Sequence, residues 1–307
     1  MSTEPNQLPP SLLRAIARRY DRRAVALSVP LDGGDECRVW RLATERDVVV
    51  VRMSPAWRTL AELHWVHELT RFCAAAVPEV IAPIPDTSGA TVFLHGGRPV
   101  SLFPFIAGQP LDRESRALRQ AAAHLLARLH GVMRAWPGCA ARPGPGPHAP
   151  QPCARDYDPP ELVDPALDAW HAQFSATKAH AVGPIHGDYY RRNVLCHGGS
   201  ICGVIDWDES SVATILIEVA WATWEFAKVA TDDDLHESRA RAFLQAYRDA
   251  GGRCAEGDLP HIMPLIRWRL REEVRRSLGA NERGEAWDRL YTEREMRAFA
   301  RLRDRGV

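Results

Sequence analysis

The fold is decided by His186-Gly187-Asp188-Tyr189-Tyr190-Arg191-Arg192-Asn193, followed shortly by Ile201-Cys202-Gly203-Val204-Ile205-Asp206-Trp207-Asp208. The second stretch is apolar and partly β-branched up to Ile205, which predicts a short buried strand that ends at Asp206. Asp188 and Asn193 lie five positions apart in the polar segment before that strand. Two carboxylates and a carboxamide are therefore expected close together at the end of a strand.

This spacing suits phosphoryl transfer from ATP. The reaction needs a carboxylate that orients the attacking hydroxyl and two oxygen ligands that hold Mg²⁺ against the nucleotide phosphates. Asp188 and Asn193 follow the D-x-x-x-x-N pattern of a kinase catalytic loop, with Asp188 as the proton acceptor and Asn193 as a metal ligand. Asp206 is the second predicted metal ligand. The alternative is that Asp188 and Asn193 are turn residues and Asp206 only ends a strand.

Composition excludes several other classes of protein. The 307 residues carry 39 Lys and Arg against 39 Asp and Glu, a balance that favours neither nucleic acid nor an anionic membrane as partner. The chain has no basic-then-apolar leader and no apolar run near the roughly 18 residues of a membrane span. Seven scattered cysteines without a C-x-x-C pair argue against a disulfide framework and a zinc site. We expect a cytoplasmic protein with reduced thiols, and the oligomeric state stays open.

Secondary-structure signals change character near residue 106. The N-terminal part predicts mostly strands, at residues 24–30, 37–42, 47–53, 80–84 and 91–105, with helices at 11–20 and 56–76. The C-terminal part predicts helices at residues 111–136 and 161–180 and almost throughout 215–307, with a Pro- and Gly-rich loop at 137–160. We therefore expect a β-rich lobe of residues 1–106, a helical lobe of residues 107–307, and a ligand site between them.

The two central motifs, H-G-D-x-x-x-x-N-V-L at His186–Leu195 and G-V-I-D-W-D-E at Gly203–Glu209, resemble the signature of the aminoglycoside phosphotransferase and choline kinase superfamily. The resemblance extends more weakly through V-V-V-V-R-M-S, A-E-L-H-W-V-H-E-L and F-I-A-G-Q, over about residues 25–230. It implies an α+β fold, namely the bilobal protein-kinase-like fold. It also implies ATP and Mg²⁺ as cofactors and the hydroxyl of a small molecule as acceptor.

The same resemblance implies a cation on the third strand that contacts the nucleotide phosphates and a helix carboxylate that holds it. The only two lysines, Lys178 and Lys228, lie outside the N-terminal part, so Arg52 is the candidate cation. Glu62 is the favoured carboxylate partner, and Glu68, six residues further along the same helix, is the alternative.

Two further segments are candidates for contact with the nucleotide. Gly33 and Gly34 would let the backbone approach the phosphates, although D-G-G-D is equally consistent with a plain hairpin turn. Phe103, Phe105 and Ile106 match the position of the family's hinge, where backbone groups and an apolar slot receive adenine; the alternative is that they are ordinary core residues.

The residues around the motif have less specific predictions. His186 is expected to brace the catalytic loop, and Trp207 to pack beneath the metal site. Asp208 and Glu209 either reach a substrate amine or a second metal, or are solvated turn acids. Relatives usually carry Asp-Leu-Ala where this chain has Glu218-Val219-Ala220, so the loop-bracing role of that carboxylate is open.

The acceptor is not determined by these motifs. The candidates are an antibiotic such as an aminoglycoside, which would confer antibiotic resistance, an amino alcohol, a sugar or a homoserine-like metabolite. Polycationic aminoglycosides would favour an acidic receptor, but residues 261–307 hold more arginines than acids. The acidic run at residues 232–234 either lies near the site or starts a helix capped by Thr231. Two alternative functions remain, a protein Ser/Thr kinase and a non-catalytic nucleotide-binding protein.

Overall fold

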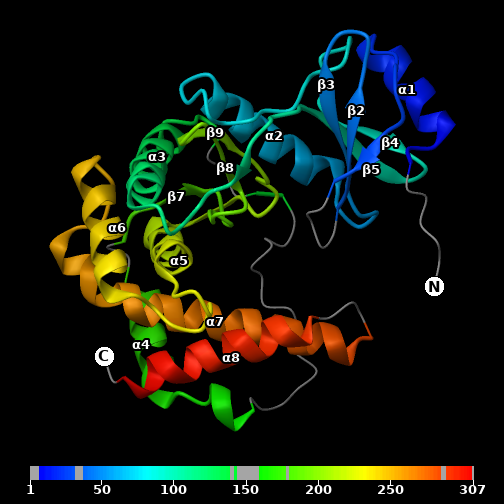
Figure 1. Ribbon diagram of the computed structural model, residues 1–307. Helices are drawn as coiled ribbons and strands as arrows, with labels where there is room; N and C mark the ends of the chain where they lie inside the picture. The colour runs from blue at the N-terminus through cyan, green and yellow to red at the C-terminus, as the bar shows by residue number, and fades with distance from the viewer. Residues whose placement is uncertain are drawn as a thin grey trace.

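The N-terminal part of the protein is built on a five-stranded antiparallel sheet. The computed structural model describes residues 7–31, 37–138, 142–143, 159–177, 180–284 and 288–305. The strands follow the order β1 (Val29–Pro30), β2 (Arg38–Ala43), β3 (Val48–Met53), β5 (Arg98–Pro104) and β4 (Phe93–His95). Helix α1 (Pro10–Tyr20) packs on this sheet at the upper right of Figure 1. Helix α2 (Leu60–Ala74) lies between the sheet and the helical part of the protein, and most of its buried apolar residues belong to the core of the helical part.

Strand β3 shows why the sheet presents a cation. Its side chains alternate between partly and fully buried, and Val49, Val51 and Met53 enter the core that α1 completes with Leu12. Because side chains alternate between the faces of a strand, Arg52 lies on the opposite face from these core residues. The pattern therefore leaves the guanidinium on the face away from α1.

The C-terminal part is mostly helical. Its helices are α3 (Arg116–Arg134), α4 (Pro165–Ala176), α5 (Ile215–Ala227), α6 (Glu237–Asp249), α7 (Leu259–Glu282) and α8 (Arg289–Asp304), with short 3₁₀ turns at Pro160–Leu162 and Glu256–Asp258. Two small sheets lie among them, one of β7 (Val182–Ile185) and β10 (Ser211–Thr214), the other of β6 (Gln109–Pro110), β8 (Val194–His197) and β9 (Ser200–Val204). Figure 1 shows α7 and α8 running together beneath α5.

Several predicted boundaries were wrong. The strand expected over residues 80–84 is a single bridge between Val80 and Val204, and the one over residues 24–30 is reduced to β1 and a bridge at Ala24. Helix α2 begins at Leu60 rather than at residue 56, because Thr59 caps it. The helix expected over residues 161–180 begins only at Pro165, after the cap Asp164.

No helix in the described part of the chain is both long and apolar enough to span a membrane. Cys37, Cys73, Cys196, Cys202 and Cys254 are free thiols, while Cys139 and Cys153 lie outside the described residues.

Candidate active site

The catalytic loop starts with a turn that only glycine permits. Gly187 has a φ of 88°, in the left-handed region that side chains disfavour. A Cβ atom built on it would lie 2.1 Å from the carbonyl oxygen of Glu209. The loop and the segment after Asp206 therefore pack backbone to backbone, and this contact brings the two central motifs together.

Glu218 on α5 holds this loop from below. Its carboxylate accepts hydrogen bonds from the backbone N–H groups of Gly187 (2.6 Å) and His186 (3.1 Å) and lies 2.7 Å from Nε2 of His130 on α3. Burial raises the pKa of Glu218, but these partners outweigh burial and hold it below its usual range. Glu218 thus braces the loop, a role that the sequence alone left open.

His186 connects the loop to the segment directly after β9 (Ser200–Val204). Its Nε2 lies 3.0 Å from the carbonyl oxygen of Ile205, and its Nδ1 accepts from the backbone N–H of Asp188 at 3.3 Å. Burial lowers the pKa of His186, so a neutral ring with its proton on Nε2 satisfies both contacts. Trp207 packs on this ring at 4.7 Å between centroids. His186 thus braces the loop, as the sequence predicts, whereas the position of Trp207 relative to a metal ion stays a prediction.

Asp188 and Asn193 form a direct pair. The Nδ2 group of Asn193 donates to the backbone oxygen (3.0 Å) and to Oδ2 (2.9 Å) of Asp188. Burial raises the pKa of Asp188 well above its usual value, and the nearby Asp206 carboxylate adds to this effect. The amide orientation leaves Oδ1 of Asn193 without a role in this pair and free for another contact.

Asp206 follows β9 in a strained conformation, with a φ of 61°. Its Oδ1 accepts from Nη2 of Arg52 at 2.8 Å. Burial raises the pKa of Asp206, but Arg52 outweighs burial and holds it below its usual range. One carboxylate and one carboxamide oxygen fit Mg²⁺, which binds in kinases through few protein ligands together with phosphates and water. Asp206 and Asn193 could therefore hold this ion.

The expected ion pair between Arg52 and the α2 carboxylate is not made among the described residues. Glu62 instead closes a capping box with Thr59 at the start of α2, and its other oxygen lies 3.7 Å from Nη2 of Arg142. Glu68, the alternative, is exposed. The prediction that Glu62 partners Arg52 is thus wrong for this structure, because a local capping interaction already uses its carboxylate.

The predicted hinge residues lie at the end of β5, and each is partly buried. The N–H of Phe105 donates to the carbonyl oxygen of Val48, and the carbonyl oxygen of Ile106 accepts from Gly108. The rings of Phe103 and Phe105 contact His67 and Arg41 respectively. The N–H of Phe105 and the carbonyl oxygen of Ile106 are thus already paired within the protein. Adenine binding at this segment stays a prediction. Gly33 and Gly34 lie outside the described residues.

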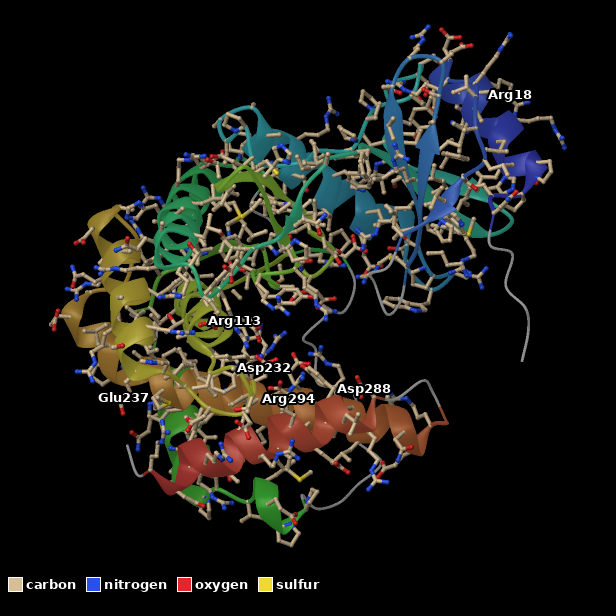
Figure 2. The ribbon with its side chains drawn as sticks, viewed as in Figure 1. Arg18, Arg113, Asp232, Glu237, Asp288 and Arg294 are labelled. Atoms are coloured by element: carbon tan, nitrogen blue, oxygen red, sulfur yellow. The ribbon has the colours of Figure 1, made fainter. Side chains whose placement is uncertain are left out.

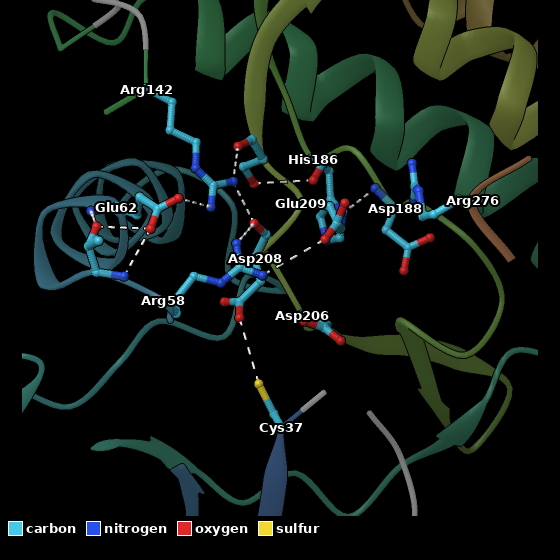
Figure 3. A network of polar contacts seen from close by, with 12 residues as sticks. Cys37, Arg58, Glu62, Arg142, His186, Asp188, Asp206, Asp208, Glu209 and Arg276 are labelled. Atoms are coloured by element: carbon cyan, nitrogen blue, oxygen red, sulfur yellow. Dashed lines mark hydrogen bonds and ion pairs between the residues drawn. The ribbon is translucent and has the colours of Figure 1, made fainter. Parts of the chain in front are cut away.

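The two acids after Trp207 lie in different surroundings. Asp208 is 6% exposed and binds Arg52, so in this structure it does not offer its carboxylate to a substrate. Glu209 keeps 26% of its side chain exposed, and its carboxylate lies 4.0 Å from Arg58. Figure 3 shows both acids within a polar network that includes Arg58 and Arg142. Of the two, only Glu209 remains a candidate for substrate contact.

The acidic run at residues 232–234 neither starts a helix nor stands free. Helix α6 begins later, at Glu237, and the three aspartates pair with arginines: Asp232 with Arg113 and Arg294, Asp233 with Arg301, and Asp234 with Arg305. Figure 2 shows Asp232 with Arg113 and Arg294 around it. These acids are therefore neutralised within the protein.

His67 makes stability depend on pH. It is 3% exposed on α2 and contacts Oγ1 of Thr91 at 2.9 Å; burial first, and then Arg52, lowers its pKa to about 3. In the unfolded chain the His67 ring binds a proton near pH 6.5, whereas in the folded protein it stays neutral down to about pH 3. The contribution of the neutral ring to the free energy of unfolding is therefore complete above pH 6.5 and is lost on acidification. We expect unfolding to cost about 2 kcal/mol less at pH 5 than at pH 7.5 through this residue alone.

Urea denaturation of the wild type and of His67→Asn at the two pH values measures this difference. Asparagine can keep the contact with Thr91 but does not titrate, so the variant should lose less stability on acidification. An equal loss in both proteins would rule out His67 as the cause.

The comparisons with known proteins agree with this geometry. The model of the phosphotransferase enzyme family matches residues 28–257 of the 307 residues, so the chain belongs to this family. The homoserine kinase of Methylobacillus glycogenes is 28% identical over 177 residues, 54% of this chain and 52% of that protein. The homoserine kinase of Neisseria meningitidis serogroup B is 24% identical over 191 residues, 61% and 62% of the two chains. The chain thus spans about half the length of the first of these relatives.

Solved structures of kinases share the fold. A microcompartment-associated aminopropanol kinase superposes with a TM-score of 0.72 at 15% identity, covering 96% of this chain and 95% of that one. Amicoumacin kinase hAmiN, in complex with AMP-PNP, Ca²⁺ and Ami, gives 0.68 at 13% identity, with 96% and 93% covered. The predicted α+β, bilobal kinase-like fold is confirmed, while the division at residue 106 stays a prediction.

Proposed function

We propose that this phosphotransferase moves the γ-phosphate of ATP to the hydroxyl of a small molecule. The pairing of Asp188 with Asn193, within electrostatic range of Asp206, is the observation that carries the proposal. Asp188 would orient the acceptor hydroxyl and accept its proton, while Asp206 and Asn193 would hold Mg²⁺, which neutralises phosphate charge when bound. Arg52 would contact the nucleotide phosphates.

We further propose an acceptor that carries both an amine and a carboxylate, such as a homoserine-like hydroxy amino acid. Charges of both signs lie around the catalytic loop on α5 and α7. Arg269 and Glu225 both act on the pKa of Asp188, and Arg269 pairs with Glu273 at 2.7 Å. Arg276 contacts Glu273 at 3.5 Å and lies within electrostatic range of Glu209.

A purely cationic antibiotic finds less support. The acidic run at residues 232–234 is paired with arginines, so it does not offer the uncompensated negative charge that a polycation needs. The sequence relatives named homoserine kinase point toward the hydroxy amino acid, whereas the structural likeness to antibiotic and aminopropanol kinases rests on the fold alone.

Release of ADP, measured with ATP and Mg²⁺ and a panel of acceptors, tests this proposal. We expect L-homoserine to raise turnover above the basal hydrolysis rate more than an amino alcohol, a sugar or an aminoglycoside does, with a phosphate ester detected by ³¹P NMR. If no small molecule raises turnover while a generic protein substrate is phosphorylated, the protein kinase alternative is favoured. ATP binding without transfer to any acceptor would favour a non-catalytic role.

A further inference from the structure

Arg52 has a carboxylate partner other than the metal-site aspartate. Its Nη1 donates to Oδ1 of Asp208 at 3.1 Å, and its Nη2 lies 3.0 Å from Oδ2 of the same carboxylate. This is a two-pronged contact, the geometry in which a guanidinium and a carboxylate bind most specifically. The contact with Asp206, by comparison, uses a single oxygen, Oδ1.

Among the described residues, α2 brings no negative charge to this guanidinium. Glu62 accepts from the N–H and hydroxyl of Thr59, each at 2.9 Å, and Glu68 is exposed. The α2 side chain that does lie within electrostatic range of Arg52 is His67, which is buried and bonded to Thr91. The helix therefore leaves the charge of Arg52 to be balanced from elsewhere.

The turn that carries Asp208 is held in place by contacts independent of Arg52. Nη1 of Arg142 donates to the carbonyl oxygens of Asp208 (2.6 Å) and Ser210 (2.8 Å). The hydroxyl of Ser210 donates to the carbonyl oxygen of His186 at 3.2 Å. Figure 3 shows Asp208 between these contacts and Cys37, whose thiol lies 3.8 Å from Oδ2. The carboxylate of Asp208 is thus fixed before any ligand arrives.

We infer that Asp208 is the positioning residue for Arg52, in the role that the family resemblance assigns to a helix glutamate. The inference rests on the proposed function, in which Arg52 contacts nucleotide phosphates. The two aspartates then have separate tasks: Asp206 is a metal ligand, whereas Asp208 stays with the guanidinium. Because the two-pronged contact uses both oxygens of Asp208, it fixes the plane and direction of the Arg52 fork without help from Asp206.

The test compares Asp208→Asn with Glu62→Gln, a matched change from carboxylate to amide at a similarly buried position. Calorimetric titration with ADP in the presence of EDTA measures phosphate binding by the protein's own residues, without a metal ion. We expect ADP affinity to fall about tenfold in Asp208→Asn and less than about threefold in Glu62→Gln. A thermal melt of each variant confirms that it is folded.

A double-mutant cycle separates positioning from general damage. In an Arg52→Gln background, Asp208→Asn should cost almost no further affinity, because its effect acts through Arg52. Additive losses, an equal loss in Glu62→Gln, or a loss seen only with Mg²⁺ and not with EDTA would overturn the inference. Failure of the wild type to bind adenine nucleotide would instead overturn the proposed function, and the inference with it.

Discussion

Asp188→Asn should lower kcat by about a thousandfold, within the range of 10²–10⁴ that a positioned general base contributes. The amide is nearly isosteric and can still contact Asn193, so the loop should keep its shape while losing the group that accepts the hydroxyl proton. ADP affinity and the melting temperature should change little. The rate is measured with the acceptor that most stimulates the wild type.

Asp304→Asn provides the control for this experiment. Asp304 is an exposed carboxylate at the end of α8 that contacts the neighbouring Arg303, and its removal should leave kcat unchanged. If Asp188→Asn keeps more than a tenth of the wild-type kcat, Asp188 is not the general base.

Glu218→Leu should destabilise the protein by about 3–5 kcal/mol, because it leaves two backbone N–H groups and the His130 ring without their buried acceptor. Turnover should fall as well, since the loop before Asp188 loses its support. Urea denaturation followed by tryptophan fluorescence measures the stability. A loss below about 1 kcal/mol would show that water or a shifted backbone replaces the carboxylate.

Glu218→Asp is the informative companion variant. It shortens the side chain on a helix placed for the longer one, so the carboxylate retreats by one methylene from Gly187. We expect a stability between those of the wild type and Glu218→Leu. A variant as stable as the wild type would show that the backbone adjusts freely to side-chain length at this position.

The central part of the site could be predicted from the sequence because its residues are close in sequence. Asp188 and Asn193 lie in the loop before the β8–β9 hairpin and Asp206 lies just after it, so a short antiparallel hairpin brings them together. Arg52 could be chosen because the two lysines lie elsewhere in the chain. The alternation of β3 places it on the face of the sheet opposite Val49 and Val51, which are buried in the core.

The partner of Arg52 could not be predicted in the same way. The family analogy favours Glu62, but the sequence Thr59-Leu60-Ala61-Glu62 also carries a capping-box signal, and the structure forms that capping box. Arg142 gave no signal at all, because it lies in a Pro- and Gly-rich segment without periodicity and reaches Asp208 across 66 positions. Contacts of this kind depend on tertiary packing rather than on local pattern.

The environment of charged residues in the C-terminal part could not be predicted for a related reason. The acidic run at residues 232–234 resembled a helix start, yet its aspartates bind arginines on α8 and at its C-cap, about 60–70 positions away. Likewise, the arginine-rich composition of residues 261–307 does not reveal that Arg267, Arg269 and Arg271 are buried, with ion pairs to Asp164, Glu273 and Asp168. A single sequence contains no direct record of such pairings.

The guanidinium on β3 also determines which covalent reagents could label the proposed nucleotide site. Acyl-transfer probes that report on kinases by labelling a primary amine near the phosphates find no such amine on β3, and lysine acetylation cannot regulate Arg52. Lys228 is buried on α5's C-terminal side between Glu225 and Glu295, far along the chain from the sheet. Dicarbonyl reagents, which react with guanidinium groups, are the suitable class for footprinting this site, with nucleotide protection of Arg52 as the signal.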